Sequence, residues 1–453
     1  MREDWSECTI NDIGNIYSGG TPKTGISEYW GDEISWISPS DLSNYSSKYI
    51  EKGAKSITKI GLIKSSAQLF PKGTILFSSR APIGYTVISN KEMCTNQGFK
   101  SIFPLGNINS EYVYYFLSNS KNKAESVATG TTFKEISKSE FAKLDIPLPP
   151  IPEQRAIVKK IETLFSSLDA GIADLKRSQE QLKIYRQSVL KKAFEGELTK
   201  KWRESNNIEN QITFKQIKEF SKVKGGKRLP KGHNYVESSK YPYLRVTDFD
   251  RMSIKQNNLK YISKDTQQKI ERYVISKSDV YISIAGSIGL AGCIPSSLNG
   301  ANLTENAAKI TELNKVDNWY LAYYLNSPNA KSVIKSSTIG NTQPKLALFR
   351  IEQISVPIPS SIKEQEQIVK EIESRLSICD IIEKQIKNSL DQAEALRQSI
   401  LKKAFEGNLL TEEEIKACKA EPDYEPASVL LERIKAEKQA HKPVKKISKK
   451  KVS

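Results

Sequence analysis

A stretch of 46 residues occurs twice in this chain of 453 residues, and no other feature limits the possible folds as strongly. Residues 153–198 align with residues 364–409 without a gap, and 23 of the 46 positions are identical. Both copies end in the letters "LKKAFEG". A repeat of this length at a fixed spacing of 211 residues indicates a duplicated structural unit.

The repeated segment is predicted to be a long helix in a coiled coil. In the first copy, apolar residues such as Ile157, Ile161, Leu164 and Leu168 recur every three or four positions, and the second copy keeps the same register. Each helix of about 43 residues would be roughly 65 Å long. Because a globular stretch precedes each helix, we expect an antiparallel pair with one globular domain at each end.

The repeated ends of the two predicted helices contain residues that helix capping does not require. Lysines suit the last turn of a helix, and Gly196 and Gly407 are predicted to be left-handed caps. Capping does not require the Ala-Phe pair that follows the lysines. If the segment occurred only once, we would interpret it as an ordinary helix C-terminus. We therefore predict a shared docking surface for a partner. Its candidate residues are Lys191, Lys192, Phe194, Lys402, Lys403 and Phe405.

The globular stretches repeat more faintly. "DIGNIYSGGTPKT" (12–24) matches "QIKEFSKVKGGKRLPKG" (216–232), and "GTILFSSRAPIGYTVI" (73–88) matches "SDVYISIAGSIGLAGCI" (278–294). Short strands, turns and a Tyr-rich helix predict an α+β domain of about 150 residues in each copy. The expected organisation is a globular domain (1–150), a long helix (151–200), a second globular domain (201–360), a second long helix (361–412) and a tail that is partly helical and then basic and disordered (413–453).

The net charge of +17 is unevenly distributed. Residues 1–150 hold 16 basic and 15 acidic residues, whereas residues 201–360 hold 24 and 13. This excess indicates a polyanionic partner, mainly for the second domain. The terminal "KPVKKISKKKVS" is basic and of low complexity, which is typical of a solvated tail.

Several function classes lack their motifs. We find no GxxxxGK[ST] phosphate loop, and "GSIGLAG" (286–292) is interpreted as a turn between strands. Five cysteines without a CxxC pair, and two distant histidines, predict no metal site. A start without an apolar signal region, and the absence of a long apolar run, favour a cytoplasmic protein with no membrane partner. We expect no catalytic residue in this chain.

Taken together, these features resemble the specificity (S) subunits of type I restriction-modification systems. The resemblance rests on "GGTPKT" with "ISWISPSDL", on the domain-closing "IPLPPIPEQ" and "VPIPSSIKEQ", on the paired "LKKAFEG" ends and on "EPASVLLERIKAEKQA" (425–440). It implies that each globular part is a target recognition domain for one half of a bipartite, asymmetric site on double-stranded DNA. The helices would set the spacing and dock two methyltransferase (M) subunits, to which restriction (R) subunits add.

The same resemblance implies that the chemistry lies in the partner subunits. Methylation would use S-adenosylmethionine, and cleavage would use ATP and Mg²⁺. The S chain itself would need no cofactor.

Candidate DNA contacts are polar side chains on predicted loops. Arg and Lys can read guanine, Asn and Gln can read adenine, and Ser and Thr are less selective. A merely solvated role is the alternative for each residue, and Arg80 and Arg245 could be structural because apolar residues flank them. The candidates are Thr21, Lys23, Ser78, Ser79, Arg80, Lys134, Lys138, Lys227, Arg228, Lys231, Arg245, Asn341, Gln343 and Lys345.

Two other functions are compatible with parts of the sequence. One is a non-enzymatic coiled-coil scaffold or interaction protein with nonspecific DNA affinity, which the nearly neutral first domain would suit. The other is the recognition module of a fused restriction enzyme, which the missing catalytic motifs disfavour.

Overall fold

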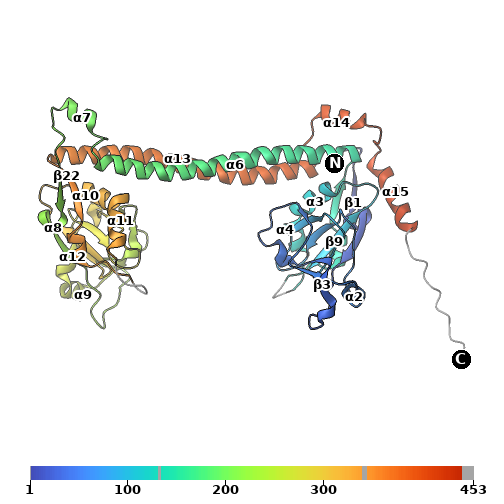
Figure 1. Ribbon diagram of the computed structural model, residues 1–453, viewed down its shortest axis with the longest axis horizontal. Coiled ribbons are helices and arrows are strands. Elements are labelled where there is room, and N and C mark those ends of the chain that lie inside the picture. The colour runs from blue at the N-terminus through green and yellow to red at the C-terminus, as the bar shows by residue number, and fades with distance from the viewer. Residues whose placement is uncertain (1, 131–133, 339–343, 441–453) are drawn as a thin grey trace. The chain divides into compact units, whose positions relative to one another are not determined.

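The computed structural model describes residues 2–130, 134–338 and 344–440. The chain forms two compact units. Unit 1 contains residues 1–173 and 390–453, and unit 2 contains residues 174–389. Each unit holds one globular domain together with part of each long helix (Figure 1).

Globular domain 1 is built on a five-stranded sheet of order β2-β9-β6-β7-β4 and a three-stranded sheet of order β5-β3-β8, while β1 pairs with β10. Its strands are β1 (Ser6–Thr9), β2 (Gly14–Ser18), β3 (Trp30–Ile37), β4 (Tyr49–Ile50), β5 (Lys55–Ile57), β6 (Ile75–Ser78), β7 (Thr86–Ser89), β8 (Cys94–Thr95), β9 (Phe99–Pro104) and β10 (Asp145–Leu148). Its helices are α1 (Ile10–Ile13), α2 (Lys59–Ile63), α3 (Ser110–Asn119), α4 (Lys121–Ser126) and α5 (Lys138–Ala142).

Globular domain 2 has two four-stranded sheets, of order β12-β21-β18-β19 and β16-β13-β20-β17, and the pairs β11-β22 and β14-β15. Its strands are β11 (Ile212–Gln216), β12 (Lys222–Gly225), β13 (Pro242–Leu244), β14 (Phe249–Asp250), β15 (Ser253–Ile254), β16 (Lys260–Tyr261), β17 (Val274–Ile275), β18 (Val280–Ser283), β19 (Ala291–Gly292), β20 (Ala301–Leu303), β21 (Ala307–Thr311) and β22 (Ser355–Pro359). Its helices are α8 (Ile217–Phe220), α9 (Lys264–Lys269), α10 (Asn318–Leu325), α11 (Pro328–Ser336) and α12 (Leu348–Glu352).

The two domains share one topology. The order β2-β9-β6-β7 in domain 1 corresponds to β12-β21-β18-β19 in domain 2, and all of these neighbours are antiparallel. The pairs β3-β8 and β13-β20 are both parallel. In each case the first and last strands of the domain, β1 with β10 and β11 with β22, pair antiparallel. The predicted α+β fold and the internal duplication are confirmed.

The long helices are α6 (Ile151–Phe194) and α13 (Ile362–Phe405). In unit 1, Ile157 and Ile161 near the start of α6 share a core with Ile400 and Ala404 near the end of α13. In unit 2, the end of α6 shares a core with the start of α13. The helices therefore pack side by side in opposite directions, as Figure 1 shows, and the predicted antiparallel pair is confirmed.

Each long helix is anchored to its domain by a buried glutamine. The Oε1 atom of Gln154 accepts a hydrogen bond from the backbone N–H of Asn109, which is the N-cap of α3, at 2.9 Å. Gln365 accepts one from the backbone N–H of Asp317, the N-cap of α10, also at 2.9 Å. The repeated "EQ" therefore fixes the helix start against the Tyr-rich helix of its own domain.

The neighbouring glutamates are buried as well. Glu364 accepts from the guanidinium of Arg203 at 2.6 Å and from the hydroxyl of Thr199 at 2.9 Å. Arg203 lies in α7 (Lys200–Ser205), the short helix that follows α6. Glu153 in unit 1 instead accepts from the indole N–H of Trp5 at 2.9 Å. Both acids therefore form buried polar contacts at the start of a long helix.

The C-terminal stretch contributes to the core of unit 1. Helices α14 (Glu412–Lys419) and α15 (Ala427–Ala440) follow α13, and α15 packs on α1. Leu430 and Ile434 are fully buried in the core of domain 1. This stretch was expected as a tail, but its helical part belongs to the folded unit. Within the described ranges, every helix is too short or too polar to cross a membrane.

Candidate nucleic-acid interface

Four loops of domain 1 are joined by backbone hydrogen bonds into one surface. The N–H of Gly20 donates to the carbonyl of Thr95 at 2.8 Å, and the N–H of Ser79 donates to that of Gly98 at 2.7 Å. The N–H of Ile136 donates to the carbonyl of Ser79 at 3.0 Å. We call these loops loop cluster 1; they are residues 19–24, 79–85 and 95–98 together with the described residues of 128–137.

Domain 2 repeats the arrangement. The N–H of Lys227 donates to the carbonyl of Leu303, and the N–H of Ile284 donates to that of Asn306, each at 2.8 Å. The N–H of Leu346 donates to the carbonyl of Ile284 at 3.0 Å. The same chain segments therefore meet in both domains. Loop cluster 2 consists of the described residues of 226–232, 284–290, 303–306 and 338–346.

Glycine is required where the first loop crosses the third. A Cβ atom at Gly19 would lie 1.7 Å from the carbonyl oxygen of Asn96, and one at Gly226 would lie 2.0 Å from that of Thr304. No real Cβ contact is that short, so the "GG" of both copies permits a close backbone approach.

Ser78 and Ser79 lie at the end of β6 and at the start of the turn that follows it. The sequence predicts both on an exposed loop. Ser78 and Ser79 are both fully buried, so that expectation is wrong. The hydroxyl of Ser78 donates to the carbonyl of Pro82 at 2.7 Å and accepts from the N–H of Tyr85 at 2.8 Å. Ser283 fixes the turn between β18 and β19 with the same pair of contacts. The "GSIGLAG" stretch is thus a turn between strands.

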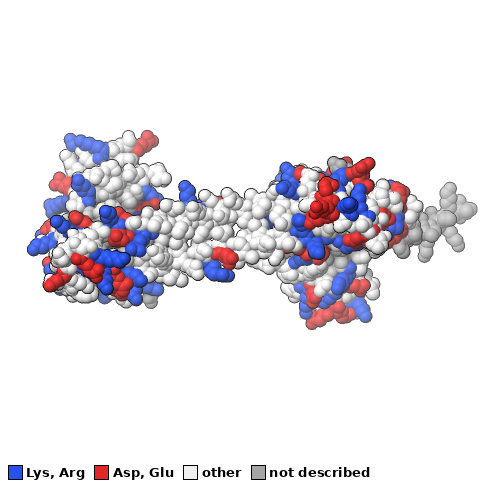
Figure 2. All heavy atoms as spheres, turned by 90° about the horizontal axis from the view of Figure 1, so that it is seen from above, with Lys and Arg blue, Asp and Glu red and all other residues white. Residues whose placement is uncertain are grey.

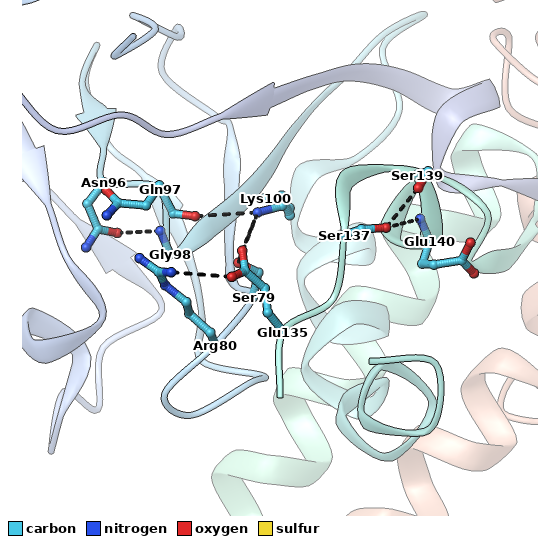
Figure 3. Close-up of polar contacts among 10 residues, drawn as sticks. All are labelled: Ser79, Arg80, Asn96, Gln97, Gly98, Lys100, Glu135, Ser137, Ser139 and Glu140. Atoms are coloured by element: carbon cyan, nitrogen blue, oxygen red, sulfur yellow. Dashed lines mark hydrogen bonds and ion pairs between the residues drawn. The ribbon is translucent and has the colours of Figure 1, made fainter. Parts of the chain in front are cut away.

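A network of polar side chains links the loops of loop cluster 1 to strand β9 (Figure 3). The ammonium of Lys100, in β9, contacts the hydroxyl of Ser79 at 3.2 Å and a carboxylate oxygen of Glu135 at 3.1 Å. The other carboxylate oxygen of Glu135 contacts the guanidinium of Arg80 at 3.4 Å. Arg80 is therefore partly held by an acid that sequence reasoning missed.

Loop cluster 2 carries its own ion pair. The Nε atom of Arg228 donates to Glu305 at 2.7 Å. Although partial burial works against it, this hydrogen bond holds the pKa of Glu305 below its usual value. The side chain of Arg228 is 79% exposed, and Lys227 and Lys231 are exposed beside it. These three predicted residues lie together on one loop.

Arg245 lies apart from this loop and has a structural role. Its guanidinium donates to Asp248 at 2.6 Å and 3.0 Å, and the backbone N–H of Arg245 donates to the same carboxylate. Asp41 accepts from the backbone N–H of Ser38 at the equivalent turn of domain 1. The alternative considered for Arg245, a structural residue, therefore has direct support.

The remaining candidates divide into three groups. Thr21 bonds to Gln97 across loop cluster 1. Lys23, Lys134, Lys138 and Lys345 are exposed. Asn341 and Gln343 lie outside the described residues.

The predicted docking residues at the helix ends behave in two ways. The rings of Phe194 and Tyr324 lie 5.1 Å apart, and those of Phe405 and Phe116 lie 5.4 Å apart, each pair within one unit. Both phenylalanines therefore pack against their own domain, which explains the repeated Ala-Phe pair without an external partner. The lysines next to them, Lys191, Lys192, Lys402 and Lys403, are exposed.

The long helices also expose apolar side chains. Ile184 is 67% exposed on α6, and Ile378 and Ile381 are 55% and 58% exposed on α13, all within unit 2. Figure 2 shows a face of the long helices that carries few charged residues, whereas basic and acidic residues are mixed over the globular domains. Among the residues that the structure describes, no group of three or more His, Cys, Asp or Glu could hold a metal ion.

The loop clusters occur once in each matched segment of a known family. A model of the family described as "Type I restriction modification DNA specificity domain" matches residues 2–177 and 209–392. The chain belongs to this family. Each copy of the specificity domain thus comprises one globular domain, its loop cluster and the first part of the following long helix.

Relatives of this specificity-domain chain include subunits of type I restriction enzymes. The MjaIX specificity subunit of Methanocaldococcus jannaschii is 36% identical over 256 residues, which cover 54% of this chain and 58% of that protein. The EcoBI specificity subunit of Escherichia coli is 26% identical over 97% of this chain and 94% of its own length. The EcoKI specificity subunit of E. coli is 25% identical over 97% of each chain.

Solved structures share the fold of this specificity-domain chain. A chain from a study of complex assembly and conformational transition of the type I R-M system has a TM-score of 0.71 and 16% identity, covering 90% of this chain and 99% of that one. The HsdS subunit from Thermoanaerobacter tengcongensis has a TM-score of 0.58 and 15% identity, covering 90% and 98%.

Proposed function

We propose that this chain is the DNA-recognition subunit of a type I restriction-modification complex, in which each loop cluster reads one half of a bipartite site on double-stranded DNA. The observation that carries the proposal is the occurrence of two loop clusters, one in each copy of the specificity domain. The two clusters share their backbone but differ in their side chains. Different side chains on one scaffold suit a site with two unlike halves.

The charges of the loops are consistent with DNA as the ligand. Lys227, Arg228 and Lys231 lie on one exposed loop of domain 2. Lysine and arginine side chains can contact DNA phosphates or guanine edges. In domain 1, Lys23, Arg80 and Lys134 lie in loop cluster 1. Domain 2 carries the larger basic excess, so we expect it to supply more of the salt-dependent binding.

We also propose that the long helices space the two half-sites and bind two methyltransferase subunits. The exposed Ile378 and Ile381, one turn apart on α13, support a protein contact, because large apolar side chains grouped on a polar surface mark interaction sites. The partner subunits would supply S-adenosylmethionine-dependent methylation of adenine. Restriction subunits with ATP and Mg²⁺ would supply cleavage, and this chain would perform no catalytic step.

Two measurements test the proposal. The tagged chain, isolated from its host, should co-purify with a methyltransferase subunit identifiable by mass spectrometry. Deletion of its gene should remove one methylated bipartite motif from the host DNA. A scaffold protein would give neither result, and retention of every methylated motif after deletion would contradict the proposal.

A further inference from the structure

Lys100 is buried beneath the surface of loop cluster 1. The residue is 7% exposed, and its ammonium contacts Ser79 Oγ at 3.2 Å, the carbonyl of Gln97 at 3.4 Å and Glu135 Oε1 at 3.1 Å. A buried ammonium is costly unless it is paired and hydrogen-bonded, and here three acceptors surround it. Because Lys100 is covered, it cannot reach DNA itself.

Glu135 lies between this buried cation and an accessible one. Its Oε1 atom contacts Lys100, and its Oε2 atom contacts Nη1 of Arg80 at 3.4 Å (Figure 3). The backbone of Glu135 also exchanges two hydrogen bonds with the backbone of Thr129, at 2.9 Å and 3.0 Å. Lys100 therefore holds both the carboxylate and the loop that carries it.

Arg80 retains donors for a ligand. Its side chain is 35% exposed, and within the described part of the chain only the contact of its Nη1 atom with Glu135 involves the guanidinium. A guanidinium has five N–H donors in a rigid fork, and two of them suffice to read O6 and N7 of guanine. Glu135 limits the orientations of the fork without occupying all of it.

The charge balance assigns a second role to Lys100. An unpaired carboxylate in loop cluster 1 would repel the phosphates of DNA. Lys100 and Arg80 together carry two positive charges against the single negative charge of Glu135. Removal of Lys100 would leave Arg80 as the only cation on the carboxylate and would draw the guanidinium toward it.

Domain 2 has other residues at the positions that correspond to Arg80, Glu135 and Lys100. Its matching backbone bridge joins Ala285 to Lys345, where domain 1 joins Arg80 to Glu135. The position that pairs with the centre of β18 is Ala308, where domain 1 has Lys100 opposite the centre of β6. The arginine, the acid and the buried lysine are thus all replaced, while the loops keep their hydrogen bonds. The network is therefore not needed to build this loop scaffold.

We propose that Arg80 reads a guanine in the half-site of domain 1, and that Lys100 and Glu135 are positioning residues that orient Arg80 for this contact. The inference rests on the proposed DNA-recognition function. It adds a specific base-reading group and the two residues that act through it.

The test maps the methylated motif made by the full chain together with its methyltransferase subunit. Arg80→Ala and Lys100→Met should relax the same G:C position in one half-site, reducing the preference for guanine roughly ten- to hundredfold. The other half-site should stay unchanged. Lys100→Arg keeps the buried cation and should restore much of the preference.

A matched control uses Lys309, a partly buried lysine of domain 2. Lys309 contacts Asp279 at 3.6 Å and the carbonyl of Val274 at 2.5 Å, away from loop cluster 2, so Lys309→Met should leave the motif intact. An unchanged motif in Arg80→Ala, whose side chain is partly exposed and whose loss should not unfold the chain, would overturn the proposal. Equal weakening of both half-sites by Lys100→Met, without a change at a single base, would also overturn it. Failure of the unaltered chain to direct any methylation would instead refute the proposed function.

Discussion

Phe194 shows how a repeated side chain acquires its role from its own domain. Its ring is 8% exposed and packs edge-to-face on Tyr320 and Tyr324. We expect Phe194→Ala to lower the free energy of unfolding of unit 2 by about 3 kcal/mol, because truncation of a buried phenylalanine removes apolar contacts and leaves a cavity. Denaturant unfolding followed by tyrosine fluorescence would measure the change.

Phe214 provides the control for this prediction. It lies in the same unit but is 71% exposed on β11, so Phe214→Ala should change the unfolding free energy by about 0.5 kcal/mol or less. Equal effects of the two substitutions would show that the aromatic packing of Phe194 contributes little. Loss of methyltransferase binding by a stable Phe194→Ala chain would return the residue to a docking role.

At the scale of single residues, the sequence predicted which loops carry the candidate DNA-binding residues, but it did not predict the side-chain contacts within those loops. It placed Arg80 and Arg228 on loops that the structure brings into the two clusters. It could not find Glu135 or Lys100, because the side chains that they pair with lie at least 21 residues away in sequence and are brought together only by the sheet. The alignment of the two repeats contains one indication that position 135 matters, since Glu135 aligns with a lysine, Lys345, in the second copy.

At the scale of elements, the long helices were predictable because their pattern is local and sustained. Apolar residues every three or four positions over 44 residues require no knowledge of distant chain segments. Helix α15 was harder, because it is short and its partners are at the other end of the chain. Its Ile434 packs at Gly106, where a Cβ atom would lie 2.5 Å from the isoleucine side chain.

The packing of the C-terminal helices against domain 1 should contribute a pH-dependent free energy to the stability of unit 1. Hydrogen bonds from Lys419 and then Tyr424 lower the pKa of Asp4 below 3.8, which stabilises the docked segment when the carboxylate is ionised. The contribution is therefore complete at neutral pH and is lost as the pH falls through the lowered pKa. Asp4→Asn should cost up to about 1 kcal/mol at pH 7, and this difference should begin to shrink as the pH falls to 3.8 and should vanish below the lowered pKa.

Urea unfolding of both chains over a pH series would measure this difference. Asp32→Asn is a suitable control, because its carboxylate is 91% exposed and its nearest lysine nitrogen, on Lys52, is 3.6 Å away. A difference between wild type and Asp4→Asn that persisted undiminished at pH 3 would contradict the linkage.

The buried acid at the start of α13 allows a second prediction at this scale. Glu364 is 1% exposed and pairs with Arg203, so Glu364→Ala leaves a buried guanidinium without its carboxylate and should destabilise unit 2 by roughly 3 kcal/mol. Thermal unfolding would detect the loss. Glu366 is exposed on the same turn, and Glu366→Ala should have little effect. Similar melting temperatures for the two variants would show that the pair is dispensable.

At the scale of the whole molecule, the duplication extends to ion pairs on the long helices. In unit 2, Arg186 contacts Asp380 at 2.7 Å. In unit 1, Arg397 pairs with Asp169. Both the arginines and the aspartates are 211 positions apart in the sequence, so the two units use the same pair at equivalent points of the helix contact.

This equivalence predicts that half of the chain can replace the whole. In a fragment of residues 1–206, α6 of one copy would meet α6 of a second copy, and two identical Arg186–Asp169 pairs would replace the two unlike pairs of the full chain. The apolar seam is also compatible, since Val189 and Ala193 stand where α13 has Ile400 and Ala404. We therefore expect a twofold dimer that directs methylation of a palindrome built from the first half-site.

The charge pair provides the decisive control for that dimer. Asp169→Arg places like charges at two symmetric contacts and should weaken dimerisation of the fragment by about tenfold, because each exposed pair contributes only about 0.5 to 1 kcal/mol. Adding Arg186→Asp restores opposite charges at both contacts and should restore the dimer. Analytical ultracentrifugation would follow assembly, and methylation mapping would identify the palindrome. A fragment that stayed monomeric at every concentration and methylated no palindrome would mean that the α6 surface pairs only with α13.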